Sequence, residues 1–288
     1  MLDLSLIIKK YRYSFYKSAG NENGKPAPCP HYAGGDQCSR KEGCFCKKLA
    51  EIRGNIDYVI PSEYRDLTIE NASGIIVSKD GVEQHVWSED NRLEIQNTLR
   101  NYLFGGVDRV LLTGGRESYN KYSQMDKRFS DGDAVIIHGD NLIGKKEGKQ
   151  SPRFLPAGKT MIACLILKEA IWRKLFATNR ADTYSVISYQ TLKQDLKLRT
   201  ERSYDLKECD WLCIDDISLP LREDDFNHQQ FVTLFDDFLM TRIEQKLPTI
   251  LVCSFDVLAK DYTHSLGYTF QKMVSSKNSW LISVGGGK

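Results

Sequence analysis

Long apolar runs are absent from this chain of 288 residues, and the longest, Met161 to Leu167, is far too short to cross a bilayer. The chain also lacks an excess of charge of one sign, since its formal net charge is only +2. Its first ten residues contain neither a basic lead nor a small-residue cleavage site, so they do not predict a signal peptide. These absences predict a cytoplasmic globular protein without a membrane anchor.

Charge and cysteine are distributed unevenly. Residues 1–50 hold nine Lys or Arg against four Asp or Glu, so the basic character is concentrated at the N-terminus. Four of the eight cysteines also lie there, within eighteen residues: Cys29, Cys38, Cys44 and Cys46. A reducing compartment disfavours disulfides, and four thiolates on glycine-rich turns suit a closed tetrahedral Zn²⁺ site.

Other uses of this cysteine cluster stay open. His31 is a rival fourth ligand, and the spacing differs from the common paired form with two residues between cysteines. An iron–sulfur cluster is therefore an alternative, and reactive thiols without metal are a third. The remaining cysteines, Cys164, Cys209, Cys213 and Cys253, lie in or beside apolar runs, which predicts ordinary buried residues.

Residues 2–19 have roughly helical periodicity and interleave basic with aromatic side chains. This composition suits single-stranded nucleic acid, through phosphate neutralisation and base stacking. It equally suits an amphipathic helix whose aromatic face packs internally or docks a protein partner. The packing interpretation is slightly favoured.

The pattern along the rest of the chain predicts an α/β fold. An Asp-Gly pair between two alternating runs indicates a β-hairpin at 74–87. From residue 88, helical segments alternate with short β-branched runs, which indicates a parallel sheet with crossover helices. The expected strands are Ala134–His138, Thr183–Tyr189, Trp211–Ile214, Thr249–Cys253 and Trp280–Val284. The expected helices are 159–175, 190–200 and 226–245, and the apolar run 109–113 has no assigned place.

Gly158-Lys159-Thr160 opens the most apolar of these helices. Such a start presents backbone N–H groups to phosphates, with the lysine reaching the terminal ones and the hydroxyl binding Mg²⁺. The strict phosphate-loop motif requires a glycine where Arg153 stands. Gly139, at the end of the preceding strand, is separated from Gly158 by eighteen intervening residues, whereas the motif has four. The sequence therefore predicts an insertion, 141–155, which we expect to be a mobile basic loop without secondary structure.

The run Trp211–Ile214 ends in Asp215 and Asp216, about fifty residues after Lys159. One carboxylate of such a pair can hold Mg²⁺ through water while the second orients the attacking water. A strand followed by an acidic turn is common. The order of strand, Gly-Lys-Thr, helix, strand and Asp-Asp is much less so, and it favours a site for ATP and Mg²⁺.

The chain resembles the bacterial helicase-loader ATPases of the DnaC/IstB branch of the AAA+ superfamily over most of its length. The resemblance rests on a helix carrying Arg242 before Lys246-Leu-Pro-Thr-Ile, on the N-terminal cysteine cluster, on Ile60-Pro-Ser-Glu-Tyr-Arg and on Leu266-Gly-Tyr-Thr-Phe. It implies an AAA+ P-loop NTPase fold and a homo-oligomer. It also implies a replicative helicase as partner, loaded or remodelled on single-stranded DNA. A transposition ATPase that assembles on duplex DNA shares the same core and is the alternative.

The resemblance assigns roles to three further residues, each of which departs from the family pattern. Asp216 stands where a water-orienting Glu is usual, and Ser254, followed by Phe255, stands where an Asn senses the γ-phosphate. Lys272 stands where an Arg is donated to the neighbouring subunit's nucleotide, and it lacks the planar guanidinium fork. We therefore expect slow hydrolysis, or a nucleotide-gated scaffold that scarcely hydrolyses.

Together these patterns predict two domains. Residues 1–56 form a helix and a zinc-binding, partner-docking module, and residues 57–288 form the AAA+ ATPase domain with the hairpin near 74–87 as an insertion.

Overall fold

The computed structural model describes residues 45–65, 67, 75–77, 83–85, 89–104, 134–139, 142–144, 153–155, 158–173, 183–219, 226–259, 262–277 and 279–284. The helix expected at 2–19, the run 109–113 and Cys29, Cys38 and Cys44 lie outside these residues.

A parallel sheet of five strands forms the centre of the chain. Its order is β6-β7-β8-β3-β9, and every neighbouring pair is parallel. The strands are β3 (Ala134–His138), β6 (Tyr184–Ser188), β7 (Trp211–Ile217), β8 (Thr249–Cys253) and β9 (Ser279–Ser283). The predicted α/β class is confirmed, and all five expected strands are present, with β7 running three residues further than its apolar run.

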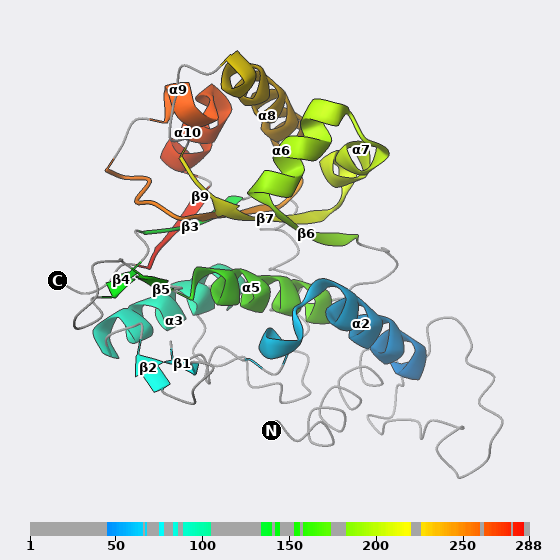
Figure 1. Ribbon diagram of the computed structural model, residues 1–288. Coiled ribbons are helices and arrows are strands. Elements are labelled where there is room, and N and C mark those ends of the chain that lie inside the picture. Colours follow the sequence, from blue (N-terminus) through cyan, green and yellow to red (C-terminus); the bar gives the residue numbers. More distant parts are fainter. Residues whose placement is uncertain are drawn as a thin grey trace, which may run out of the picture.

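Helices cover both faces of the sheet (Figure 1). One face carries α2 (Phe45–Val59), α3 (Glu89–Phe104) and α5 (Lys159–Arg173). The other carries α6 (Tyr189–Leu198), α7 (Glu201–Glu208), α8 (Phe226–Glu244), α9 (Thr263–Leu266) and α10 (Tyr268–Ser275). Right-handed crossovers require this division, because the chain runs from β3 to the far edge at β6 through α5 and then returns strand by strand in the opposite direction.

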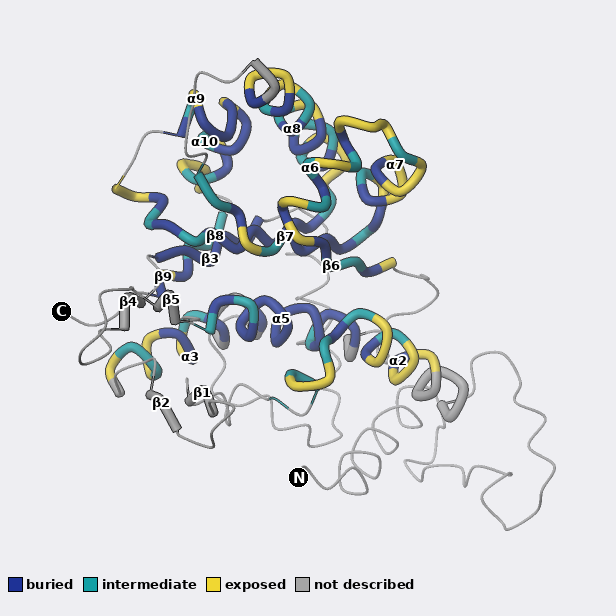
Figure 2. The backbone as a smooth tube through the Cα atoms, viewed as in Figure 1, coloured by how far each residue is buried: buried dark blue, intermediate teal, exposed yellow. Residues whose placement is uncertain are grey.

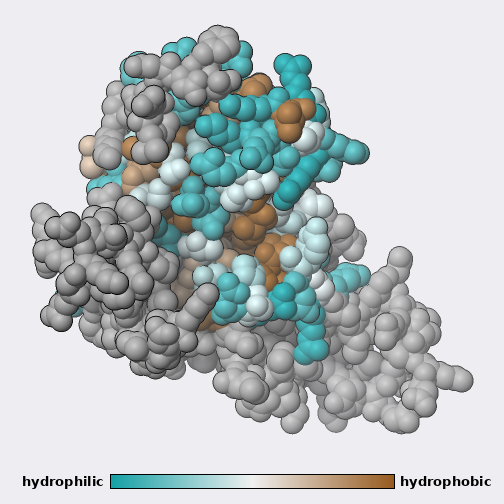
Figure 3. Space-filling model, in the orientation of Figure 1, coloured by the Kyte–Doolittle hydropathy of each residue, from teal (hydrophilic) through white to brown (hydrophobic). Residues whose placement is uncertain are grey.

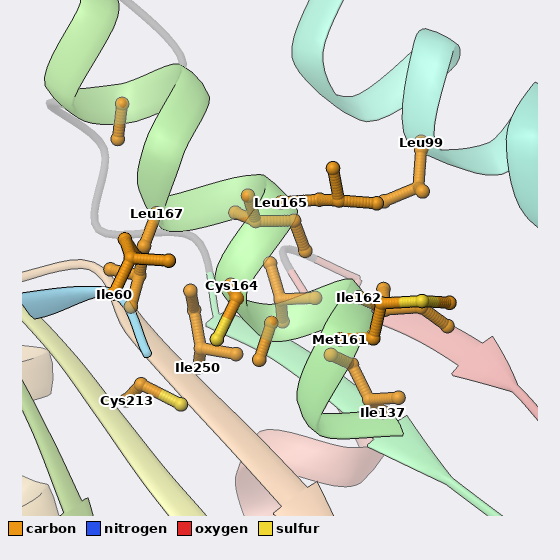
Figure 4. Packing of buried hydrophobic residues seen from close by; sticks show 14 of the residues in the cluster. Ile60, Leu99, Ile137, Met161, Ile162, Cys164, Leu165, Leu167, Cys213 and Ile250 are labelled. Atoms are coloured by element: carbon orange, nitrogen blue, oxygen red, sulfur yellow. The ribbon is translucent and has the colours of Figure 1, made fainter. Parts of the chain in front are cut away.

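Alternate residues of the strands point into two separate hydrophobic clusters. On β3, Val135 and Ile137 face α5, whereas Ala134 and Ile136 face α6, α8 and α10. Helix α5 is buried along most of its length (Figure 2). Figure 4 shows its side chains packed between strand residues such as Ile137 and Ile250 and residues from the N-terminal part of the chain.

Burial on both sides explains why Met161 to Leu167 is apolar throughout, as an interior helix requires. No helix in the described part of the chain is both long and apolar enough to cross a membrane.

The segment after α2 is tied to α5 by polar contacts. The buried Lys168 on α5 donates hydrogen bonds to the backbone oxygens of Arg65 and Leu67. The Arg65 guanidinium donates in turn to the backbone oxygens of Ile60 and Asp57, at 2.9 and 2.6 Å. The boundary expected between residues 56 and 57 falls inside α2, and Ile56 and Ile60 on its two sides belong to the same hydrophobic cluster.

Two short antiparallel ribbons accompany the main sheet. The hairpin expected at 74–87 is confirmed by the pairing of β1 (Ile75–Val77) with β2 (Glu83–His85). The expectation of a structureless loop at 141–155 is wrong, because β4 (Leu142–Gly144) pairs with β5 (Arg153–Leu155). The inserted segment therefore leaves Gly139 and returns to Gly158 as a β-ribbon, whose paired strands bring its two ends together.

Arg242, which precedes Lys246-Leu-Pro-Thr-Ile in the chain, has a structural role. Arg242 is 1% exposed, and its guanidinium donates to the backbone oxygens of Leu206, Cys209 and Pro248 at 2.8–3.0 Å. It thereby satisfies carbonyls at the C-terminal end of α7 and in the turn before β8. These contacts hold α7, α8 and β8 together behind the sheet.

The glycine in Leu266-Gly-Tyr-Thr-Phe is explained by close packing. Gly267 has φ of 89°, and a Cβ there would lie 2.6 Å from Asp236 Oδ1. The same Oδ1 accepts a hydrogen bond from the backbone N–H of Thr269 at 2.6 Å, so Asp236 on α8 caps the start of α10. Any side chain at 267 would displace this cap.

Two glycines provide a matched pair of stability tests. Gly54, inside α2, is exposed, and a Cβ there would meet nothing within 4 Å. We expect Gly54→Ala to raise the free energy of unfolding by about 0.5–1 kcal/mol, through helix propensity alone. Gly267→Ala should lower it by about 2 kcal/mol or more, because both the backbone conformation and the Asp236 cap are lost. Urea unfolding of both variants checks the expectation, which a similar change in the two would contradict.

Candidate nucleotide-binding site

The predicted site residues gather where β3, β7 and β8 end. Adjacent β3 and β8 are followed by helices on opposite faces, α5 and α9, so their carboxyl ends border a topological switch point. Open α/β sheets bind ligands in the crevice at such a point. Gly139 follows β3, Asp215 lies near the end of β7, and Ser254 follows β8.

Lys159 joins the two ends of the phosphate loop by a hydrogen bond. Gly139 and Gly158 have φ of 133° and 75°, values that favour glycine at both ends of the insertion. Lys159, the first residue of α5, is 6% exposed, and its Nζ donates to the backbone oxygen of Gly139 at 2.5 Å. The ammonium group therefore sits directly over the loop, at the N-terminal end of a helix whose dipole favours an anion there.

Thr160 and Asp215 meet across the site although 55 residues separate them. Thr160 Oγ1 lies 3.1 Å from each carboxylate oxygen of Asp215. A hydroxyl and a carboxylate in contact form the donor set that holds Mg²⁺ beside the phosphates in P-loop NTPases. Burial raises the pKa of the Asp215 carboxyl, and the hydrogen bonds from Thr160 and from the backbone N–H of Asp216 oppose this shift.

Asp216 adopts a left-handed backbone, with φ of 57°, and its side chain is exposed. Its neighbourhood contains an irregularity in the pairing of β7 with β8, between Ile214 and Ile217. Aspartate and asparagine tolerate this conformation better than longer side chains do, because their short polar groups bond locally. This preference gives a physical reason for the shorter acid, Asp, at this position, and the strain there is typical of functional sites.

Ser254 is held against the end of β7. Its Oγ and its backbone N–H both donate to the backbone oxygen of Ile217, at 3.0 and 2.8 Å. The hydroxyl is half-buried at the same edge of the sheet as Asp215. Phe255, which follows it, is buried and packs on Tyr262 with ring centroids 4.7 Å apart. The aromatic residue therefore supports the segment from behind, while the serine is the polar group nearest the site.

The structure does not bring Lys272 to this group. Lys272 lies on α10 with an exposed side chain, whereas Lys159, Thr160 and Asp215 are buried or half-buried. An exposed position is what a residue that acts on a neighbouring copy requires.

Sequence reasoning missed His138 and Asp256, which lie beside the phosphate loop. His138 ends β3 and is 1% exposed, and its Nδ1 lies 3.1 Å from Asp256 Oδ1. Burial is the main cause that lowers the pKa of His138, and Lys159 adds to it, whereas Asp256 opposes it. Nothing in the local sequence pairs the two, since one follows β8 and the other precedes Gly139.

The cysteines divide into two groups. Cys164, Cys209, Cys213 and Cys253 are buried and free, as expected, and burial raises the pKa of Cys164 to about 12, which keeps it unreactive. Of the four predicted metal ligands, only Cys46 falls in a described helix, the first turn of α2. Among the described residues, no group of three or more His, Cys, Asp or Glu could hold a metal ion.

Comparisons with known proteins find distant structural similarities. No protein-family model and no curated protein matches it. Among solved structures, DnaI is 15% identical with a TM-score of 0.44, covering 79% of this chain and 93% of DnaI. The DnaC helicase loader is 13% identical with a TM-score of 0.46, covering 78% and 99%. The initiator DnaA, bound to AMPPCP and single-stranded DNA, is 16% identical with a TM-score of 0.40, covering 78% and 50%.

DnaC is the loader whose branch the sequence resembles. The assignment of the fold rests on the parallel sheet and the loop positions of the chain itself.

Two lysines test where the phosphate loop lies. We expect Lys159→Ala to abolish ATP binding, because only Lys159 stands at the start of the helix that presents its amides to phosphate. Lys149→Ala, in the inserted segment, should weaken binding only modestly. Isothermal titration with ATP and Mg²⁺ measures both, and the reverse ranking would place the loop elsewhere.

The charge on Asp215 should oppose folding at pH 7. A carboxyl whose pKa is raised binds its proton more tightly in the folded than in the unfolded state, so its contribution to stability rises as pH falls through that value. Asp215→Asn should therefore stabilise the nucleotide-free protein at pH 7 by about 1 kcal/mol, while Mg²⁺-dependent ATP binding is lost.

The gain from Asp215→Asn should shrink as pH is lowered, because the wild-type carboxyl then becomes neutral as well. Thermal unfolding between pH 4 and 8 measures it. Asp237→Asn, on an exposed part of α8, is the matched control and should change stability by less than about 0.5 kcal/mol. A lower melting temperature for Asp215→Asn at pH 7 would contradict the expectation.

Proposed function

We propose that this chain is a replication-related AAA+ protein that binds ATP with Mg²⁺ and loads or remodels a replicative helicase on single-stranded DNA. The observation that carries the nucleotide part is the contact of Thr160 with Asp215 beside the Lys159 ammonium. The three residues come from the starts and ends of different elements, and together they supply the cation, the hydroxyl and the carboxylate of a phosphate and magnesium site.

Each residue at the site has a task in binding. Lys159 exchanges its bond to the Gly139 oxygen for bonds to the terminal phosphates, so the loop carbonyl holds the ammonium in place beforehand. Thr160 and Asp215 would hold Mg²⁺, and the ion would neutralise phosphate charge. Asp216, exposed beside Asp215, orients the attacking water. Ser254 is the group that contacts the γ-phosphate from the end of β8.

Asp216 and Lys272 make turnover slow. Asp216 is one methylene shorter than the glutamate of the resembling family, which places the water less well. Lys272 is a point charge, and it cannot offer the bidentate fork with which an arginine stabilises the transition state. ATP binding is retained in this proposal and hydrolysis is weak, so a nucleotide-gated scaffold is the limiting case.

Contact with single-stranded DNA has support in the described part of the chain. The end of α6 and the start of α7 expose a run of basic and large side chains, Lys197, Leu198, Arg199, Arg202 and Tyr204. Figure 3 shows that the surface over these helices is mainly hydrophilic. Basic side chains beside an exposed tyrosine provide phosphate contacts and a surface for base stacking.

We assign docking of the helicase to the residues up to the first turn of α2, where the sequence predicts the zinc module of Cys29, Cys38, Cys44 and Cys46. Because α2 packs with the ATPase core, the docking module comprises the chain up to the first turn of α2.

Gel filtration of the chain with a replicative helicase from the same organism tests the proposal. We expect a stable complex when ATP is present, and binding of single-stranded DNA by that complex. Assembly on duplex DNA without a helicase would favour the transposition ATPase instead. Absence of ATP binding would reject the nucleotide part.

Lys272 should control assembly more than chemistry. With ATP, the wild type should self-associate more readily than with ADP and release phosphate slowly, on the order of 10³-fold below an ATPase with an arginine at this position. Lys272→Ala should weaken ATP-dependent assembly, and Lys272→Arg should raise turnover. Light scattering and phosphate release measure the two effects. Lys277→Ala, also exposed near the end of α10, is the control, and equal effects of both alanine variants would remove the intersubunit role.

A further inference from the structure

The segment that follows β8, Ser254 to Leu258, is fastened to the phosphate loop at two points. The backbone N–H of Gly139 donates to the Phe255 oxygen at 3.0 Å. One residue before Gly139 and one residue after Phe255, His138 Nδ1 lies 3.1 Å from Asp256 Oδ1. The first contact joins two backbones, and the second joins a buried imidazole to a carboxylate whose side chain is 42% exposed.

Asp256 also organises the rest of its segment. Its Oδ1 accepts a hydrogen bond from the backbone N–H of Leu258 at 3.0 Å, and its backbone oxygen accepts one from the Tyr262 hydroxyl. The Tyr262 ring packs edge-on against Phe270 of α10, at 6.0 Å between centroids. One residue therefore connects the phosphate loop, the turn after β8 and the helix that carries Lys272.

The charges around His138 fit a neutral imidazole whose Nδ1 faces the Asp256 carboxylate. The charged groups that act on it are Asp256, from the segment after β8, and Lys159, from the start of α5. Burial and the lysine disfavour a proton on the second nitrogen, so the uncharged ring retains a single N–H, and the carboxylate selects Nδ1 to carry it.

We propose that His138 and Asp256 form a positioning pair that holds the Ser254–Leu258 segment at the γ-phosphate side of the site. This inference rests on the proposed ATP site, and it adds two residues that neither touch the nucleotide nor belong to the motifs in the sequence. Because Ser254 stands two residues before Asp256, loosening the pair displaces the hydroxyl that meets the γ-phosphate. The β-phosphate contacts from the start of α5 are left in place.

The test compares ATP with ADP. Dissociation constants for both nucleotides, with Mg²⁺, are measured by titration for wild type, Asp256→Ala, His138→Ala, the double variant and His138→Asn. We expect each alanine variant to lose on the order of tenfold in ATP affinity, the effect of one buried hydrogen bond to a charged group, and less than threefold in ADP affinity. The double variant should lose no more than the worse single variant, because both break the same contact.

Rescue separates positioning from general loss of packing. In His138→Asn the side-chain amide offers an N–H close to the place of Nδ1, so ATP affinity should return to within about threefold of wild type. Asp237→Ala, which removes an exposed carboxylate from α8, is the matched control and should leave both affinities unchanged. If His138→Ala does not fold, the ratio of the two affinities in Asp256→Ala decides, since that side chain is partly exposed.

Equal losses for ATP and ADP, losses that multiply in the double variant, or a His138→Asn protein as weak as His138→Ala would each overturn the positioning pair. A wild type that binds ATP alongside variants that are unchanged overturns the pair alone. A wild type that binds no ATP overturns the proposed function and the pair together.

Discussion

Helix α5 is buried between the sheet on one side and α2 and α3 on the other, and this burial fixes where its first residues lie. An apolar helix of fifteen residues that is buried along most of its length contributes a large share of the hydrophobic stabilisation of the domain. Because α5 cannot rotate or slide without exposing apolar surface, Lys159 and Thr160 at its start are held as rigidly as the core. The nucleotide site is built on that rigidity.

The groups in this arrangement that lower the stability of the fold lie at the carboxyl ends of the strands. Lys159 and His138 are almost fully buried, and Asp215 is desolvated enough for its pKa to rise. Asp216 adds a left-handed backbone without being glycine. Burying the charges of Lys159 and Asp215 does not help the nucleotide-free chain to fold, and both groups suit a polyanion with a bound cation. The two clusters on the sheet faces supply the stability that offsets them.

The motifs singled out in the sequence divide into two kinds once their contacts are known. Gly158-Lys159-Thr160 and Asp215-Asp216 converge on one site. Arg242 and Gly267, by contrast, hold helices behind the sheet, the first by capping carbonyls and the second by making room for Asp236.

Local patterns in the sequence were sufficient for the strands and for the start of α5. Alternating or continuous β-branched runs determined all five strands, and a Gly-Lys-Thr before an apolar run determined the start of α5, because burial and phosphate contact each act on consecutive residues. The same reasoning failed for 141–155, where two strands of three residues each are too short for a period to show and Lys, Gly and Ser predict a loop. It also left α7 unassigned, since α6 ends at Arg199 in a left-handed conformation that basic residues rarely adopt.

Only the tertiary structure decided what meets across the sheet. The pairing of Thr160 with Asp215 depends on the strand order, which places β8 between β7 and β3. The pairing of His138 with Asp256 depends on the parallel register of β3 and β8, which ends both strands at one level. The sequence by itself determined which segments would be buried and which residues would begin α5. The choice of partners across more than fifty or a hundred residues follows from the direction of the crossovers and the packing of α5, and no local pattern records either.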